Sequence, residues 1–268
     1  MEKVLEKLLD TIICSNCVDI MSRLPDNCID LTLTSPPYDK LRDYKEFTFE
    51  FKRIAKQLYR ITKKGGVVVW VIGDSTINGS ETGSSFRQAL FFKKLGFNLH
   101  DTMIYQKSGF AYPSTNRYHQ IFEYMFVFSK GRPKTFNPIR DKKNETQYTF
   151  SKKRRKKDGS MTHANDTSRI QVSPYGMRTN IWKYTTGKGN STKDEIAFKH
   201  PAIFPEKLCE DHIKTWTNSN SNDIVFDPMM GSGTTIKVAN QLGRRYIGVD
   251  ISEEYCRIAR ERIKQLKE

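Results

Sequence analysis

Two short apolar runs, separated by a glycine turn and a helical segment, constrain the fold of this chain most strongly. Residues 223–227 (Asp-Ile-Val-Phe-Asp) and 246–250 (Tyr-Ile-Gly-Val-Asp) have the length and composition of buried strands. Residues 233–242 between them have the length and composition of a helix. Parallel neighbours in a sheet need a crossover connection, which is usually a helix. The segment therefore predicts a βαβ unit and a mostly parallel sheet.

Further periodic segments along the 268 residues extend this sheet into a doubly wound α/β fold. We expect Lys63-Lys-Gly-Gly66 to end the helix at residues 49–61 as a C-cap, and Ser252 to cap the last helix. Strands are expected at residues 11–17, 29–34, 67–72, 102–106 and 124–128, and helices at residues 4–9, 49–61, 85–95, 205–216 and after Ser252.

Composition excludes several other classes of protein. The longest unbroken apolar stretch, Val67–Ile72, is far shorter than the ~20 residues of a membrane-spanning helix. The charged first residues lack the apolar core of a secretory signal, so we expect an intracellular protein. Five cysteines form an odd set, which argues against a disulfide scaffold. Cys14 and Cys17 have metal-ligand spacing, but no second pair completes a tetrahedral site, and no metal is expected.

Positive charge is concentrated in one part of the chain. The formal net charge is +15, and residues 130–157 carry +10 of it, with twelve Lys or Arg and two acidic residues. Such a concentration suits a polyanion, although charge alone also fits a solvated surface or a nuclear targeting segment. The hexamer 152–157 is expected to be a loop or arm, because like charges repel in a packed element. The polar, basic residues 131–190 read as an inserted lobe.

The glycine turn after residue 227 has the properties of a cofactor site. Gly231 and Gly233 permit positive φ and close approach of a ligand, and the amide groups that start the next helix suit an anionic group. Asp250 ends the following strand, where a carboxylate accepts hydrogen bonds from ribose hydroxyls. Ile236 occupies the third small position of a nicotinamide fingerprint, and a P-loop lysine is missing. We therefore expect a nucleoside cofactor without phosphates.

Residues 31–38, Leu-Thr-Leu-Thr-Ser-Pro-Pro-Tyr, form a strand that two prolines terminate. Neither proline has an N–H and both have a fixed φ, so strand pairing stops and the carbonyls keep set directions. The Ser35 hydroxyl and these carbonyls are acceptors, and Tyr38 offers a stacking face. This combination suits the exocyclic amine of a base taken out of a duplex. On its own, the tetrapeptide would indicate only a proline-terminated strand.

Together, Thr34-Ser-Pro-Pro-Tyr38 and the segment Phe226–Thr234 resemble the amino-methylating DNA methyltransferases. The catalytic turn precedes the glycine loop, with the basic insertion between them, which is similar to the permuted β group. The resemblance covers nearly the whole chain. It implies a circularly permuted, Rossmann-like methyltransferase fold of the seven-stranded type. Residues 1–130 would form the catalytic half, 131–190 a target-recognition lobe that binds duplex DNA, and 191–268 the half that binds S-adenosyl-L-methionine.

The resemblance also implies roles for individual residues. Asp19 would contact the adenine of S-adenosylmethionine, Asp250 its ribose, and Asp227 with the glycine loop its methionine portion. Residues 199–206 resemble the segment that packs on the methionine end, and residues 65–74 match the family's buried strand and turn. The implied catalytic residues are Ser35, Pro36, Pro37 and Tyr38. The implied cofactor-binding residues are Asp19, Thr34, His200, Pro201, Phe204, Asp227, Pro228, Gly231, Ser232, Gly233, Thr234 and Asp250. The implied DNA-binding residues are Lys142, Lys143, Lys152, Lys153, Arg154, Arg155, Lys156 and Lys157.

The family resemblance implies direct transfer of the methyl group to the amino nitrogen, with no covalent enzyme intermediate. Serine at position 35 is commoner in relatives that methylate cytosine N4, so this activity is favoured, with adenine N6 as the alternative. Met229 replaces the family's usual aromatic residue, and no residue between 108 and 130 is assigned a role.

Other readings and properties stay open at this stage. Weaker alternatives are an RNA methyltransferase, an inactive DNA-binding relative and a nicotinamide-dependent oxidoreductase. A cytoplasmic, nucleoid-associated location is expected. The sequence does not decide between monomer and homodimer, or whether a separately encoded restriction endonuclease accompanies the protein.

Overall fold

The computed structural model describes residues 2–37, 49–110, 115–150, 155–161, 169–219 and 221–266. The chain forms two compact units. The larger unit comprises Met1–Asn137 and Asn180–Glu268, and the smaller unit comprises Pro138–Thr179. No helix within the described ranges is long and apolar enough to cross a membrane.

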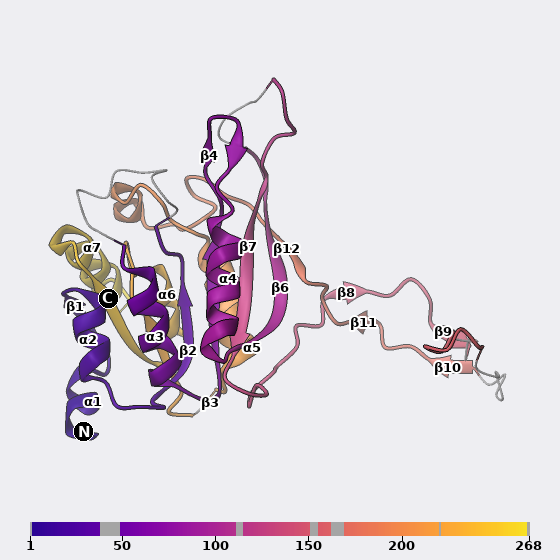
Figure 1. Cartoon of the computed structure of the whole chain (residues 1–268), viewed down its shortest axis with the longest axis horizontal. Helices are drawn as coiled ribbons and strands as arrows, with labels where there is room; N and C mark the ends of the chain where they lie inside the picture. Colours follow the sequence, from indigo (N-terminus) through magenta and orange to yellow (C-terminus); the bar gives the residue numbers. More distant parts are fainter. Residues whose placement is uncertain are drawn as a thin grey trace. The chain divides into compact units, whose positions relative to one another are not determined.

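The larger unit is built on an eight-stranded sheet (Figure 1). Its strand order is β1-β14-β13-β2-β3-β7-β6-β12, and only β7 runs antiparallel to its neighbours. The predicted α/β fold with a mostly parallel sheet is confirmed. The strands are β1 Thr11–Cys14, β2 Ile29–Thr34, β3 Thr62–Ile72, β6 Asn98–Lys107, β7 Phe122–Ser129, β12 Ile181–Tyr184, β13 Ile224–Asp227 and β14 Arg245–Asp250, and a small hairpin pairs β4 Thr76–Ile77 with β5 Ser80–Glu81.

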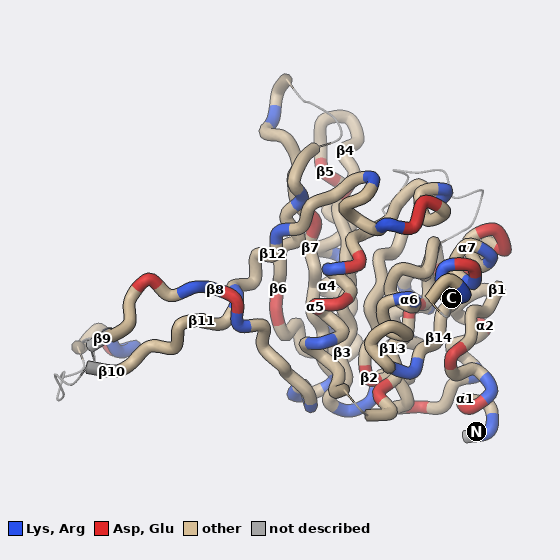
Figure 2. Tube along the Cα trace, turned by 180° about the vertical axis from the view of Figure 1, so that it is seen from behind, with Lys and Arg blue, Asp and Glu red and all other residues tan. Residues whose placement is uncertain are grey.

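Helices cover the sheet in two layers (Figures 1 and 2). In one layer α2 packs on α3 and α3 packs on α4; in the other, α5 packs on α6 and α6 packs on α7. A layer on each face buries both sides of the parallel strands, as a doubly wound fold requires. The helices are α1 Glu2–Leu8, α2 Cys17–Arg23, α3 Phe51–Ile61, α4 Ser84–Leu95, α5 Glu206–Trp216, α6 Thr234–Gln241 and α7 Glu253–Lys264, with a 3₁₀ turn, η1, at Glu195–Lys199.

The middle of the sheet supplies the core beneath α3 and α4. Every residue from Val67 to Ile72 is buried, which explains why that run is apolar at both odd and even positions. Trp70 donates its indole N–H to Gln88 Oε1 at 2.8 Å. Phe92 of α4 stacks on Phe128 of β7 with 4.6 Å between ring centroids. These contacts fix α4 against β3 and β7.

Two predicted element boundaries are wrong. Lys63-Lys-Gly-Gly66 does not cap a helix, because β3 already begins at Thr62, and Gly65, with φ of +83°, pairs its N–H with the Lys130 carbonyl. The first strand does not reach Cys17, since the Asn16 side chain accepts the Val18 N–H at 2.8 Å and starts α2 there. Both differences come from contacts that local periodicity does not report.

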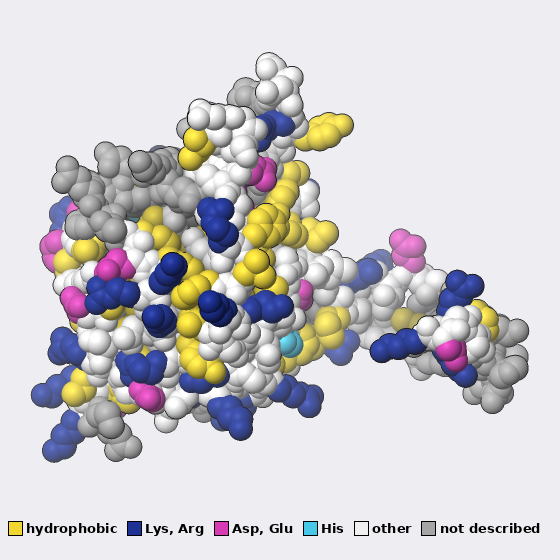
Figure 3. Space-filling view, viewed as in Figure 1, with side chains coloured by type: hydrophobic (Ala, Val, Ile, Leu, Met, Phe, Trp, Pro, Cys, Tyr) yellow, Lys and Arg dark blue, Asp and Glu magenta, His cyan; other side chains and the backbone are white. Residues whose placement is uncertain are grey.

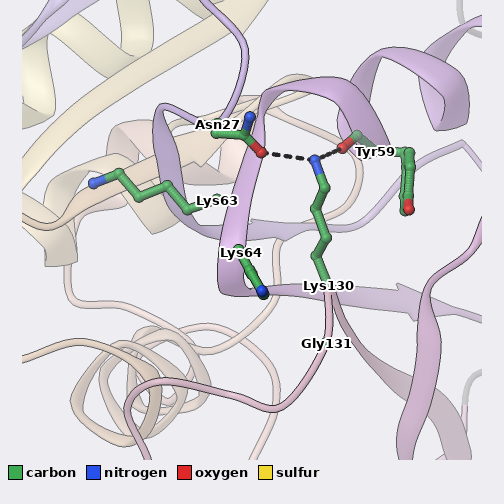
Figure 4. A pocket seen from close by; sticks show the side chains of 6 residues that line it. All are labelled: Asn27, Tyr59, Lys63, Lys64, Lys130 and Gly131. Carbon is green, nitrogen blue, oxygen red and sulfur yellow. Dashed lines mark hydrogen bonds between the residues drawn. The ribbon is translucent and has the colours of Figure 1, made fainter.

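A lysine-lined pocket lies where β3 begins and β7 ends (Figure 4). The Lys130 ammonium donates to Asn27 Oδ1 at 2.9 Å and to the Tyr59 and Thr62 carbonyls, and it lies 4.7 Å from the Tyr59 ring centroid. Lys63 pairs with Asp30 at 2.6 Å. These two ammonium groups therefore tie loop and strand ends together at the amino edge of β2 and β3. The pocket is lined by Asn27, Tyr59, Lys63, Lys64, Lys130 and Gly131.

The smaller unit contains two antiparallel strand pairs, drawn one after the other along a ribbon in Figure 1. β8 (Lys142–Lys143) pairs with β11 (Tyr175–Gly176), and β9 (Tyr148–Phe150) pairs with β10 (Arg169–Gln171). The predicted insertion, residues 131–190, is longer than this unit. Residues 181–184 form β12, which pairs with β6 in the larger sheet.

Candidate active site

The order of the strands brings distant motifs to one edge of the sheet. From β13 the chain crosses through α6 to β14, whereas from β2 it crosses through α3 to β3 on the other side. The crossovers diverge between β13 and β2, and ligands bind at the carboxyl ends of strands at such a switch point. Thr34 and Asp227 end these two strands. The proline turn and the glycine loop follow them directly.

A buried hydrogen bond joins these two motifs. Thr34 Oγ1 donates to Asp227 Oδ1 at 2.7 Å, and Met229 N donates to the same oxygen at 3.1 Å. Asp227 is only 2% exposed, and this burial raises the pKa of its carboxyl to about 7, against the effect of hydrogen bonds from Thr34 and Thr235. The Asp227 carboxylate thus lies beneath the glycine loop and ties it to the strand that carries Ser35.

The two glycines of the loop occupy positions that a side chain would not fit. Gly231 has φ of +52°, and an added Cβ would lie 2.7 Å from His200 Nε2. Gly233 has φ of +77°, and its added Cβ would lie 2.5 Å from the Cβ of Ala259. The His200 ring also meets the Tyr255 ring edge to face at 4.3 Å. The positive φ expected at both glycines is confirmed, and their near neighbours are His200 and α7; close approach of a ligand stays a prediction.

Two further predicted acids lie along the same edge. Asp250 accepts the Gly231 N–H at 2.8 Å on one oxygen and the Ser252 N–H at 2.9 Å on the other, and burial raises its pKa. The backbone N–H of Ile251 also interacts with this carboxylate, and of its roughly four acceptor sites at least one is left for a ligand hydroxyl. Cys14, the last residue of β1, is opposite Asp250 in the sheet, and Asp19 follows as an exposed residue in the first turn of α2.

The other residues predicted to bind substrate, cofactor or DNA differ in their exposure to solvent. Ser35 and Pro37 are half-buried and Pro36 is buried, whereas Tyr38 lies outside the described residues. Among the other predicted cofactor contacts, Phe204 is half-buried and Pro201 is exposed; Pro228, Ser232 and Thr234 are buried. In the smaller unit Lys142, Lys143, Arg155, Lys156 and Lys157 are exposed, and Lys152, Lys153 and Arg154 lie outside the described residues.

Asp74, for which the sequence predicted no role, organises the neighbouring strand end. It follows β3 and accepts hydrogen bonds from the Ser85 N–H at 3.0 Å, Ser84 Oγ at 3.1 Å and Thr82 Oγ1 at 3.2 Å. These hydrogen bonds lower its pKa although partial burial opposes them. Asp74 therefore caps the start of α4 from outside the helix. The sequence signal that could have identified Asp74 is its position just after a buried strand, where side chains lie at the carboxyl edge of the sheet.

The chemistry of this edge fits S-adenosylmethionine. The carboxylates of Asp19 and Asp250 can accept hydrogen bonds from an adenine amine and ribose hydroxyls. The first-turn amides of α6 have no acceptor within their own helix and suit a carboxylate. Among the residues that the structure describes, no three His, Cys, Asp or Glu side chains converge as metal ligands.

Comparison with known proteins identifies the family. A family model described as DNA methylase matches residues 29–261. The orphan methyltransferase M.BamHII of Bacillus amyloliquefaciens is 58% identical over 244 residues, which cover 89% of this chain and 90% of that protein.

Solved structures agree in fold. The cytosine-N4-specific PvuII DNA methyltransferase superposes with a TM-score of 0.67 at 21% identity, covering 94% of this chain and 85% of that one. The M1.HpyAVI–SAM complex superposes with a TM-score of 0.60 at 24% identity, covering 94% and 98%. With a family match over most of its length and a relative 58% identical, this chain belongs to the amino-methylating DNA methyltransferases, the N6/N4 DNA methylase family.

Proposed function

We propose that this protein transfers a methyl group from S-adenosyl-L-methionine to the N4 amine of cytosine in duplex DNA, at a specific sequence. The main support for the proposal is the contact between the ends of β2 and β13. There, Thr34 donates a hydrogen bond of 2.7 Å to Asp227, so the Ser-Pro-Pro turn and the glycine loop follow neighbouring strand ends. A base acceptor site and a cofactor site on neighbouring strand ends are what direct transfer between two ligands needs.

The chain's own residues would hold and orient the target amine. The Ser35 hydroxyl and the Pro36 carbonyl accept its two hydrogens out of the ring plane, which localises the nitrogen lone pair. The prolines keep both acceptors fixed, because φ is locked and strand pairing has ended. When bound, S-adenosylmethionine would supply the methyl carbon: the nitrogen lone pair forms the new bond as the carbon–sulfur bond breaks, the sulfur leaves as a neutral thioether, and the nitrogen loses one proton to solvent. Tyr38 would stack on the extruded base.

The cofactor would occupy the edge formed by β1, β14 and β13. Asp19 would accept from the adenine amine and Asp250 from the ribose hydroxyls, while the start of α6 binds the methionine carboxylate. Asp227 would act through the loop, since it is buried and its described hydrogen bonds come from Thr34, Thr235 and Met229. The M1.HpyAVI structure of similar fold is named as a complex with SAM, which supports this cofactor.

Duplex DNA is the proposed substrate, and the smaller unit would contact it. Exposed Lys142 and Lys143 lie on a two-stranded ribbon, a shape that the major groove of DNA admits. Figure 3 shows basic side chains on both units, in keeping with contacts to a polyanion. Base flipping would then deliver the target nucleotide to Ser35.

The choice of cytosine N4 rests on Ser35 and on the name of the PvuII enzyme, which is cytosine-N4-specific and shares the fold. The test is mass spectrometry of nucleosides from DNA that was incubated with the protein and S-adenosylmethionine. N4-methylcytosine is the expected product. Detection of N6-methyladenine would show that the target base is adenine and would leave the rest of the mechanism unchanged. If RNA incubated in the same way is methylated and DNA is not, duplex DNA is refuted as the substrate.

A further inference from the structure

Four charged residues form a closed cluster beneath the glycine loop. Arg262 of α7 donates to Asp194 Oδ2 at 2.8 Å and to Glu206 Oε1 at 2.7 Å. Lys237 of α6 donates to the same two oxygens at 2.7 and 2.8 Å. Each cation therefore bridges both acids. The Arg262 side chain is 0% exposed and that of Lys237 is 7% exposed.

Arg262 also holds the glycine loop directly. Its Nη1 donates to the Ser232 carbonyl at 2.8 Å and to Thr234 Oγ1 at 3.0 Å. A guanidinium presents five N–H donors in a rigid plane, and these contacts use all three of its nitrogens. One side chain thus links the loop, through its backbone, to both acids.

Asp194 lies in the segment that carries His200, and Glu206, the first residue of α5, follows that segment directly. The base of this segment is closed by Glu206 N, which donates to the Ser191 carbonyl at 2.9 Å, and by Thr192 Oγ1, which donates to Glu206 Oε1 at 2.6 Å. Between these ends, the chain brings the His200 ring against Gly231. Residues 192–205 therefore form a wall over the glycine loop, and the charge cluster anchors that wall.

Burying two cations beside two half-buried acids is expensive, since each ion loses part of its solvation, and apolar residues of similar volume are often as stabilising. In this cluster Arg262 contacts both the loop and the two acids, and Lys237 contacts the same acids, so we explain the cluster by the positions that it fixes and not by its net contribution to stability. We propose that Arg262 is a positioning residue that, with Lys237, holds the 192–205 wall on the glycine loop and so sets the affinity for S-adenosylmethionine. This inference rests on the proposed cofactor site.

The test compares Arg262→Lys with Arg260→Lys. Lysine keeps the charge at 262 but cannot reach Asp194, Glu206 and the Ser232 carbonyl together. Arg260 lies on the same helix in an exposed pair with Glu253, and it serves as the control. Calorimetric titration with S-adenosylmethionine should show a loss of affinity of at least tenfold for Arg262→Lys and none for Arg260→Lys. Turnover at saturating cofactor and the KM for DNA should change less than threefold.

A milder pair of variants keeps the inference testable if Arg262→Lys does not fold. Thr192→Val removes the hydroxyl that donates to Glu206 and accepts the Asp194 N–H at 3.1 Å, whereas Thr192→Ser keeps it. The affinity for S-adenosylmethionine should be three- to tenfold lower in the valine variant than in the wild-type protein, and the serine variant should keep the wild-type affinity. Unchanged affinity in folded Arg262→Lys or Thr192→Val protein, with only a lower melting temperature, would overturn the positioning role.

The results that would refute the proposed function differ from those that would refute the positioning role of Arg262. If the wild-type protein neither binds S-adenosylmethionine nor methylates DNA, the proposed function is refuted. If it does both and Arg262→Lys binds the cofactor normally, only the positioning role is refuted.

Discussion

Replacing Asp227 by asparagine should remove a pH dependence of folding stability that the wild-type protein has. Burial raises the pKa of this carboxyl from 3.8 to about 7. A carboxyl with a raised folded-state pKa stabilises the protein when it is protonated. This contribution is complete below the unfolded pKa and is lost as the pH rises through 7.

The magnitude follows from the shift. Each pKa unit corresponds to about 1.4 kcal/mol, so the full contribution is about 4 kcal/mol, of which about 3 kcal/mol is lost between pH 5 and pH 8. Asparagine accepts the same hydrogen bonds from Thr34 and from the Met229 N–H but does not ionise. The free energy of unfolding of wild-type protein minus that of Asp227→Asn should therefore fall by about 3 kcal/mol across this range.

The assay is chemical unfolding of both proteins at a series of pH values in one buffer system. Titration of all other groups cancels in the difference between the two proteins. A wild-type minus Asp227→Asn difference that stays constant from pH 5 to pH 8 would refute the reasoning that the buried carboxyl takes up a proton near pH 7.

Three further predictions concern the active site and the DNA contacts. Ser35→Ala removes one acceptor of the target amine, so single-turnover methylation should slow at least tenfold, which corresponds to about 1.4 kcal/mol. The affinity for S-adenosylmethionine, measured by calorimetry, should stay the same. An unchanged methylation rate would show that Ser35 has no part in the mechanism. Gly231→Ala puts a Cβ 2.7 Å from His200 Nε2 at a positive φ, so calorimetric affinity for S-adenosylmethionine should fall at least tenfold. Unchanged affinity would show that the loop takes up a side chain here without moving the cofactor site. Replacing Lys142 and Lys143 by alanine should weaken DNA binding at all sequences and reduce the slope of log K against log salt by about 2; an unchanged slope would show that they contact no phosphates.

Most of the fold could be predicted from local signals. The run Val67–Ile72 identifies a buried central strand, and the glycines at 231 and 233 mark where β13 ends and α6 begins. The Ser252 cap was also predictable, because its hydroxyl and the acidic first turn are adjacent in sequence. Such signals depend on residues within one turn or one strand of each other, and a single sequence reports them directly.

What the sequence could not supply depends on contacts between distant segments. Lys63-Lys-Gly-Gly66 has the composition of a helix cap, yet Gly65 instead pairs with Lys130, which is brought alongside by the sheet. Arg262 falls on the apolar face of α7 between Ala259 and Ile263, and this placement was the only sequence signal of its burial. The acids that neutralise it are 56 and 68 residues away.

The junction of Thr34 with Asp227 explains why the order of the motifs can be permuted. These residues are 193 positions apart, and they meet because β2 and β13 are neighbours in the sheet. The catalytic turn needs only the end of β2 and the cofactor loop only the end of β13, so the connection between the strands can be long. In this chain that connection accommodates β3, β6, β7, the smaller unit and α5. An insertion in this connection can change in length and charge without disturbing the two strand ends, which is a physical reason why the smaller unit suits the target-recognition role proposed for it.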